Sequence, residues 1–191
     1  DLTNFGRLAE VDRVVRAVRK YNAHVLAVPG NCDYSEVDAY LTSEGINLHR
    51  KCVTIDQIAF LGLGGSLPCP GKTPNEFTED KLGAFLEEAS SNLNSTMPVV
   101  LVSHQPPHRT VTDLARNGQH VGSQSVRTFI VQVQPMICFT GHIHEGRGID
   151  TIGETQVVNP GPLREGGYAY AKVSYSQVEV VERRGQQTTD L

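Results

Sequence analysis

The sequence predicts an α/β protein in which a mixed sheet, or two packed sheets, carries helices on the outside. The first two-thirds of the 191 residues alternates strand-like apolar runs with amphipathic helical patterns. The last third contains only short strand-like runs separated by turn residues. An apolar content of 39% and 18 glycines suit a loop-rich chain that buries a real core. We expect one domain covering residues 1–191.

The first part of the chain is expected to supply two helices and three strands. Apolar residues at helical spacing over Leu8–Val18 predict an amphipathic helix, and His24–Val28 predicts a short strand. A second helix is expected over Ser35–Glu44, with its first serine as N-cap and the following glycine as its stop. Two strands joined by a hairpin-length connection follow at Cys52–Ile55 and Ile58–Leu63.

The remainder is predicted to begin with an irregular Pro- and Gly-rich loop and to end in strands. The predicted elements are the loop Leu67–Thr78, a helix through Leu82, Phe85, Leu86 and Ala89, the strand Pro98–Val102, a helix over Val126–Val133, the strand Pro135–Thr140, and strands near 148–152, 155–158, 168–173 and 178–181. The strand Pro98–Val102 is wholly apolar, which is typical of a strand covered on both faces.

Charge and composition argue against several function classes. The net charge of −4 disfavours nucleic acid or an anionic membrane surface as the main partner. No apolar run approaches the roughly 18 residues of a membrane span. The four cysteines are scattered without a C-x-x-C pair, so we expect reduced thiols and a cytoplasmic protein.

Polar side chains stand at the ends of several predicted strands, where open α/β sheets bind ligands. These positions are Asp1, Gly30-Asn31-Cys32-Asp33, Ser103-His104 and Gly141-His142-Ile143-His144. The last motif places two histidines at i and i+2, which point to the same side if the backbone is extended. One carboxylate, one amide and three imidazoles form a mixed donor set that fits Mn, Fe or Zn better than Mg or Ca.

The order of these motifs resembles the calcineurin-like metallophosphoesterases, in particular small prokaryotic members with a G-N-C-D motif. Asp1-Leu2-Thr3-Asn4 resembles the family's second motif without its leading glycine, and Gly30-Asn31-Cys32-Asp33 resembles the third. Val102-Ser103-His104 resembles the fourth motif, and Gly141-His142-Ile143-His144 resembles the fifth. The first motif, D-x-H, is absent, so we expect a strand–helix–strand unit to precede Asp1 in a longer chain.

The resemblance implies a four-layer α/β/β/α sandwich of two mixed sheets flanked by helices. It also implies hydrolysis of a small phosphodiester or phosphomonoester by a metal-bound hydroxide, with two divalent ions (Mn, Fe, Zn or Ni). In that arrangement Asp1 bridges both ions, and Asn31, His104 and His142 complete the shell of one ion. His144 binds the other ion, whose site is incomplete in this sequence. The alternative is a catalytically weak family member that acts as a protein-interaction scaffold.

Four further residues carry less specific expectations. Cys32 stands where many family members have a histidine thought to protonate the leaving group, and a thiol would donate that proton poorly. Asp33 either contacts substrate as a catalytic residue or caps the following helix. Arg147 and Arg109 could each hold a phosphate bidentately, or could have a solvated or structural role.

Overall fold

The structure of the protein is a computed structural model that describes residues 1–94, 96–174 and 177–185. Its helices are α1 (Leu8–Arg19), α2 (Ser35–Ser43), α3 (Glu79–Ser90) and α4 (Gln124–Val133), with short 3-10 turns η1 (Val111–Asp113), η2 (His144–Gly146) and η3 (Leu163–Glu165). Its strands are β1 (Cys52–Ile55), β2 (Ile58–Leu63), β3 (Val99–Ser103), β4 (Ile137–Thr140), β5 (Gly148–Ile152), β6 (Thr155–Asn159), β7 (Gly167–Val173) and β8 (Val178–Arg184).

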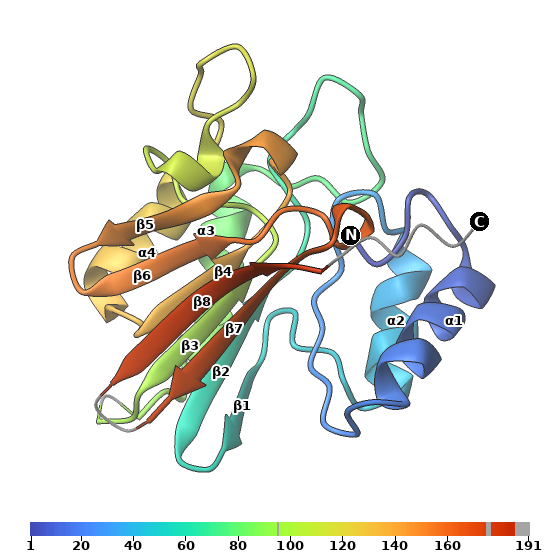
Figure 1. The fold of residues 1–191 in the computed structure, drawn as a ribbon, viewed down its shortest axis with the longest axis horizontal. Helices are drawn as coiled ribbons and strands as arrows, with labels where there is room; N and C mark the ends of the chain where they lie inside the picture. The colour runs from blue at the N-terminus through green and yellow to red at the C-terminus, as the bar shows by residue number, and fades with distance from the viewer. Residues whose placement is uncertain (95, 175–176, 186–191) are drawn as a thin grey trace.

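A six-stranded mixed sheet with the order β1-β2-β3-β4-β6-β5 forms the centre of the molecule (Figure 1). The inner strands β2, β3, β4 and β6 run parallel, and the edge strands β1 and β5 run antiparallel to their neighbours. Register pairs Leu63 with Ser103, and Ser103 with Thr140. The carboxyl ends of β2, β3 and β4 therefore meet at one edge of the sheet, which is where polar loops can gather around a ligand.

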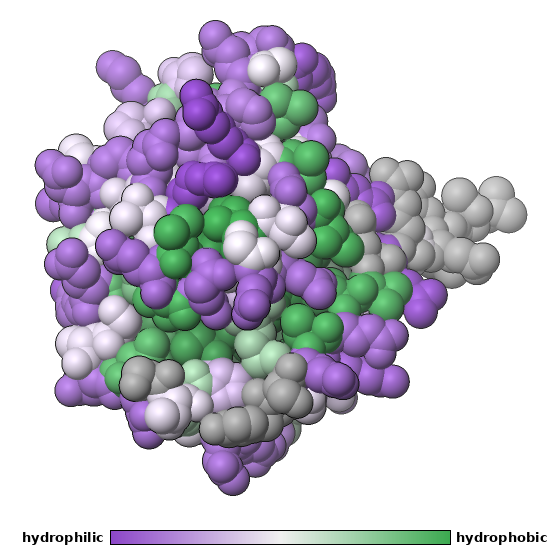
Figure 2. All heavy atoms as spheres, turned by 90° about the vertical axis from the view of Figure 1, so that its left-hand side faces the viewer, coloured by the Kyte–Doolittle hydropathy of each residue, from purple (hydrophilic) through white to green (hydrophobic). Residues whose placement is uncertain are grey.

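The hairpin β7–β8 forms a second, two-stranded antiparallel sheet that lies over one face of the six-stranded sheet (Figure 1). Between the sheets, Val100 and Ile137 are buried against partly buried residues of the hairpin such as Ala171. Figure 2 draws the side of the molecule that is on the left in Figure 1, and apolar residues are visible there among polar ones. The predicted two-sheet architecture is confirmed, but the second sheet is antiparallel rather than mixed, because consecutive strands joined by a short connection can pair only in that sense.

Helices α3 and α4 cover the opposite face of the six-stranded sheet (Figure 1). Leu86 of α3 and Ile130 of α4 are buried against strand residues such as Leu101. Along β3, Leu101 faces these helices, whereas Val100 faces the second sheet. This alternation explains why a strand buried on both faces is apolar at every position.

Helices α1 and α2 pack against each other and form a separate cluster around Val11, Val15 and Leu41. They lie to one side of the two sheets in Figure 1, so helices flank the sheets as predicted. Within the described ranges, every helix falls short of the length and apolar character that crossing a membrane requires.

Two local expectations are wrong. His24–Val28 does not form a strand, because only Ala27 makes ladder contacts, with its N–H donating to Ile46 and its carbonyl accepting from Leu48, both at 2.8 Å. The segment therefore pairs through a single bridge instead of a strand ladder. The N-cap of α2 is Tyr34, and Ser35 is the first helical residue.

Candidate metal and phosphate site

Two histidines follow the carboxyl ends of neighbouring strands. His104 comes directly after Ser103, the last residue of β3, and His142 lies two residues after the end of β4. The N–H of His104 donates to the carbonyl of Leu63 at 2.8 Å, and the N–H of Gly141 donates to the carbonyl of His104 at 3.3 Å. These backbone contacts continue the sheet register past the strand ends and bring the two imidazoles together.

Both imidazoles converge on the side-chain oxygen of Asn31. His104 Nε2 and His142 Nδ1 each lie 2.9 Å from Asn31 Oδ1. His104 Nε2 is also 3.6 Å from Asp1 Oδ1. We call these four atoms, contributed by Asp1, Asn31, His104 and His142, the donor cluster. Asn31 and His104 are only 4% and 7% exposed, so these two residues are shielded from water, whereas His142 is half-buried and Asp1 is exposed.

The spacing and chemistry of the donor cluster fit a divalent metal ion. Neighbouring ligands at about 2.1 Å from an octahedral ion are about 3 Å apart. Mixed nitrogen and oxygen donors favour Mn, Fe or Zn. Within the described residues, no group of three or more His, Cys, Asp or Glu side chains is arranged to hold a metal ion. The donor cluster instead centres on an amide oxygen, that of Asn31, with the carboxylate of Asp1 at the longer separation.

The protonation states of both histidines suit ligation. Burial lowers the pKa of His104 well below its ordinary value of 6.5, and burial lowers the pKa of His142 to about 4. The charged amino group of Asp1 lowers both pKa values further. Both rings are therefore neutral at pH 7, which is the form that binds metals.

The backbone at His142 differs from the extended form assumed for the two-histidine motif. His142 has φ of 65°, in the left-handed region that few non-glycine residues occupy, and His144 opens the turn η2. His144 is exposed, and its Nδ1 lies 3.2 Å from Nη2 of Arg164. The structure thus brings His104 and His142 into contact with Asn31 and places Asp1 beside His104, while His144 contacts Arg164.

Asp33 fixes the first residues of the chain against the Gly30–Asp33 loop. Its carboxylate is fully buried and accepts hydrogen bonds from the N–H groups of Leu2, Thr3 and Gly30 and from the hydroxyl of Thr3, at 2.7–2.9 Å. Neither oxygen caps α2, whose N-cap is Tyr34. This geometry favours a positioning role for Asp33 over both direct contact with substrate and helix capping.

Gly30 allows Asp1 to approach this loop. A Cβ atom on Gly30 would lie 2.1 Å from Oδ1 of Asp1, which is far inside van der Waals contact. The same Oδ1 accepts a hydrogen bond from the backbone N–H of Cys32 at 2.8 Å. Glycine at this position is thus a packing requirement of the site.

The thiol of Cys32 is half-buried, and burial raises its pKa. The thiol is therefore protonated at neutral pH and is not poised as a thiolate nucleophile. Its sulfur lies 3.7 Å from Nδ2 of Asn31, so it borders the donor cluster.

The two predicted phosphate-binding arginines lie beside the turns η1 and η2. Arg109 is exposed with φ of 58°, and its N–H donates to Asp113 of η1 at 3.1 Å. Arg147 is half-buried and directly follows η2. A Cβ atom on Gly161 would lie 3.3 Å from Cδ of Arg147, so the loop after β6 packs on this side chain. The roles of both arginines toward substrate stay predictions.

The loop Leu67–Thr78 supplies site residues that the sequence analysis missed. Cys69 Sγ lies 3.6 Å from Nε2 of His142, and Thr73 Oγ1 accepts a hydrogen bond from Nδ2 of Asn31 at 3.0 Å. No motif points to these residues. The signal that could have found them is that a long irregular loop follows the carboxyl end of β2, and such loops are often functional.

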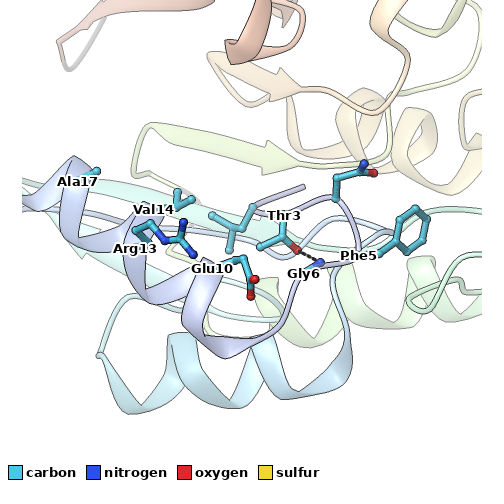
Figure 3. A pocket seen from close by; sticks show the side chains of 9 residues that line it. Thr3, Phe5, Gly6, Glu10, Arg13, Val14 and Ala17 are labelled. Atoms are coloured by element: carbon cyan, nitrogen blue, oxygen red, sulfur yellow. Dashed lines mark hydrogen bonds between the residues drawn. The ribbon is translucent and has the colours of Figure 1, made fainter.

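A cavity of about 670 Å³ lies between the first residues of the chain and α1 (Figure 3). Residues Leu2–Gly6 line one side, and the α1 residues Glu10, Arg13, Val14 and Ala17 line the other. The Leu2–Thr3 backbone, which Asp33 holds, connects this cavity to the candidate site. None of the four donor-cluster residues lines this cavity, so it is separate from the candidate metal site.

Comparisons with known proteins agree with this fold. A family model described as metallophosphoesterase, calcineurin superfamily, matches residues 4–183. The chain is similar to the uncharacterized protein MJ1162 of Methanocaldococcus jannaschii, with 43% identity over 166 residues, covering 85% of this chain and 74% of that protein. One crystal structure shares the fold with a TM-score of 0.75 and 22% identity, covering 92% of this chain and 71% of the other. The crystal structure of TT1561 of Thermus thermophilus gives a TM-score of 0.67 and 18% identity, covering 94% and 81%.

Proposed function

Because the chain belongs to the calcineurin superfamily of metallophosphoesterases, we propose that it hydrolyses a small phosphate ester, a diester ahead of a monoester. The family assignment supports a general metal-dependent phosphoesterase role. The observation that carries the proposal for this chain is the donor cluster, in which His104 and His142 both meet Asn31 Oδ1 at 2.9 Å.

Each residue of the cluster has a distinct part in this proposal. Asn31, His104 and His142 hold a divalent metal ion through one amide oxygen and two neutral ring nitrogens. Asp1 adds a carboxylate, which offsets part of the charge of the ion. When bound, a divalent ion supplies Lewis acidity toward the phosphate oxygens and activates water as the nucleophile. Mn is the first ion to test, and two ions are proposed for the full family arrangement.

The environment of Cys32 bears on the choice of substrate. Since burial raises the pKa of this thiol, it is a weak proton donor to a leaving group near pH 7. Esters whose leaving group departs without a proton should therefore be hydrolysed best. We propose aryl and other low-pKa phosphodiesters as the first substrates to assay.

The test compares wild-type protein with His104→Ala and a matched control, His24→Ala. His24 is an exposed histidine outside the donor cluster. Metal-stripped protein is titrated with Mn while the hydrolysis of bis-nitrophenyl phosphate and nitrophenyl phosphate is followed. We expect Mn-dependent turnover in the wild type and in His24→Ala, and a loss of at least two orders of magnitude in His104→Ala.

Equal activity in wild type and His104→Ala would refute the site assignment. The absence of any metal-dependent turnover in wild type, with either ester, would instead favour the protein-interaction scaffold.

A further inference from the structure

The loop between β2 and α3 reaches the donor cluster at Asn31. We infer that Thr73 is a positioning residue that fixes the orientation of the Asn31 amide, and that Glu76 in turn fixes Thr73. The metal-binding consequence rests on the proposed function, whereas the amide orientation can be tested without metal.

The hydrogen-bond chain from Asn31 to Glu76 has a defined direction. Thr73 Oγ1 lies 2.6 Å from Glu76 Oε1 and 3.0 Å from Asn31 Nδ2. An ionised carboxylate only accepts hydrogen bonds, so the Thr73 hydroxyl must donate to Glu76. The Thr73 oxygen has then used its only hydrogen and can only accept a further hydrogen bond. The Asn31 group that faces it must therefore be the donor, Nδ2. The other end of the amide, Oδ1, is thereby turned toward His104 and His142.

Glu76 is the final acceptor in this series of hydrogen bonds, and further hydrogen bonds hold it in place. Its Oε1 also accepts from the backbone N–H groups of Thr73 at 2.7 Å and Cys69 at 3.2 Å. Hydrogen bonds to a charged group are stronger than those between neutral groups. These hydrogen bonds, led by the one from the Thr73 hydroxyl, lower the pKa of Glu76 and keep it ionised at neutral pH.

The loop is also tied to the backbone on either side of the Asn31 side chain. The N–H of Asn75 donates to the carbonyl of Asn31 at 3.1 Å, and Asn75 Nδ2 donates to the carbonyl of Gly30 at 3.0 Å. Phe77 anchors the following residues by packing on Phe85 with ring centroids 5.0 Å apart. Thr73 is therefore presented to Asn31 from a loop with fixed ends.

Removing the Thr73 hydroxyl should release this orientation. Without the Thr73 hydroxyl, Nδ2 keeps only the weaker contact with the Cys32 sulfur at 3.7 Å. The amide can then rotate by half a turn, which places Nδ2 against the two imidazoles. His142 Nδ1 would then have to accept a hydrogen bond, and its proton would move to Nε2. His104 Nδ1 lies 3.3 Å from the amino nitrogen of Asp1 and stays an acceptor, so His104 Nε2–H would face the Nδ2 donor of the turned amide. The cluster would lose its central oxygen ligand, and the loss of outer partners of this kind typically lowers metal affinity about 10–100-fold.

The variants are Thr73→Val, which keeps the shape, Thr73→Ser, which keeps the hydroxyl, and Glu76→Gln, which keeps the volume but can donate to Thr73. Thr54→Val is the matched control, because Thr54 is exposed on β1, outside the loop. The first readout is the tautomer of His104 and His142 in the metal-free full chain, by ¹⁵N NMR of the imidazoles. The second is the dissociation constant for Mn by calorimetry.

We expect His104 Nε2–H and His142 Nδ1–H in the wild type, Thr73→Ser and Thr54→Val. We expect mixed tautomers at His142 and about 10–100-fold weaker Mn binding in Thr73→Val, with a smaller change in Glu76→Gln. Wild-type tautomers and Mn affinity within twofold in Thr73→Val would overturn the inference. If Thr73→Val fails to fold by circular dichroism, Thr73→Ala, which also removes the hydroxyl, decides by the same criteria. If the wild type binds no Mn, the proposed function fails, and the tautomer comparison alone supports or overturns the role of Thr73.

Discussion

The buried carboxylate of Asp33 offers a direct test of how the site is held together. In Asp33→Asn the side chain keeps its shape but replaces one acceptor oxygen with an NH₂ group. Oδ1 accepts from the N–H and hydroxyl of Thr3, and Oδ2 accepts from the N–H groups of Leu2 and Gly30. Whichever way the amide faces, two of these four hydrogen bonds to the carboxylate are lost. Backbone N–H groups then meet another donor, whereas the Thr3 hydroxyl can turn to accept from the new NH₂ group.

The cost follows from the number of hydrogen bonds lost. Each bond to a charged group contributes about 1.5–3 kcal/mol, so losing two costs about 3–6 kcal/mol. That is a large share of a total stability of about 5–15 kcal/mol. For a chain of this size the melting temperature should fall by about 6–24 °C. Mn affinity should fall as well, because Asp33 holds Leu2 and Thr3, and Asp1 precedes them at the donor cluster.

The assay is urea unfolding of the metal-free protein combined with Mn titration. Asp56→Asn is the matched control, since Asp56 is exposed in the turn between β1 and β2 with φ of 49°, a conformation that asparagine tolerates well. A catalytic role for Asp33 makes the opposite forecast, with lost turnover but unchanged stability and Mn affinity. A stability loss below about 1 kcal/mol would refute the assignment of four hydrogen bonds to this carboxylate.

Two further predictions follow from the environments of single residues. Cys32→Ser should keep most of its turnover on a nitrophenyl phosphodiester, whose leaving group needs little protonation; a loss as deep as that of His104→Ala would give the thiol a chemical or metal-binding role. Burial lowers the pKa of His49 from 6.5 to about 4, and its Nδ1 accepts from the N–H of Gly64 at 2.8 Å. Between those pH values the unfolded state binds more protons at this residue, so stability should fall as the pH drops from about 6.5 to about 4, by up to about 3 kcal/mol. Urea unfolding across this range should show a smaller pH slope in His49→Gln than in wild type, and equal slopes would contradict the assignment.

Most of the fold could be predicted because its elements are encoded by local periodicity. The wholly apolar run predicted β3, and the helical spacing of apolar residues predicted α1, α3 and α4, with bounds that agree with the structure to within a few residues. The segment His24–Val28 has a strand-like composition, but a strand also needs a partner along its length. Only Ala27 finds one, and that pairing is set by residues 46–48, which the local pattern of the segment does not contain. Strand propensity describes a fit to neighbours rather than a property of the segment alone.

The residues of the donor cluster could be predicted from the sequence, whereas Thr73, which positions one of them, could not. His104 directly follows the last residue of β3, so its placement follows from the topology. Asn31 lies four residues after the single bridge at Ala27, and the motif Gly30-Asn31-Cys32-Asp33 rather than a strand end pointed to it. Thr73 lies in a loop without periodicity, and its contact with Asn31 depends on how that loop folds back through Asn75 and Glu76. Such a contact is a property of the tertiary structure and leaves no spacing in the sequence.

The two histidines of the fifth motif show how one dihedral angle can change a site prediction. The rule that residues i and i+2 face the same side holds only for an extended backbone. At His142 the chain adopts φ of 65°, and η2 begins at His144. A left-handed residue between a strand and a turn costs free energy and persists only when surrounding contacts compensate for it. At this position the compensation includes the hydrogen bond between His142 Nδ1 and Asn31 Oδ1 at 2.9 Å. The left-handed residue that places His142 Nδ1 against Asn31 thus also ends the extended segment, and beyond it His144 lies 3.2 Å from Arg164 Nη2.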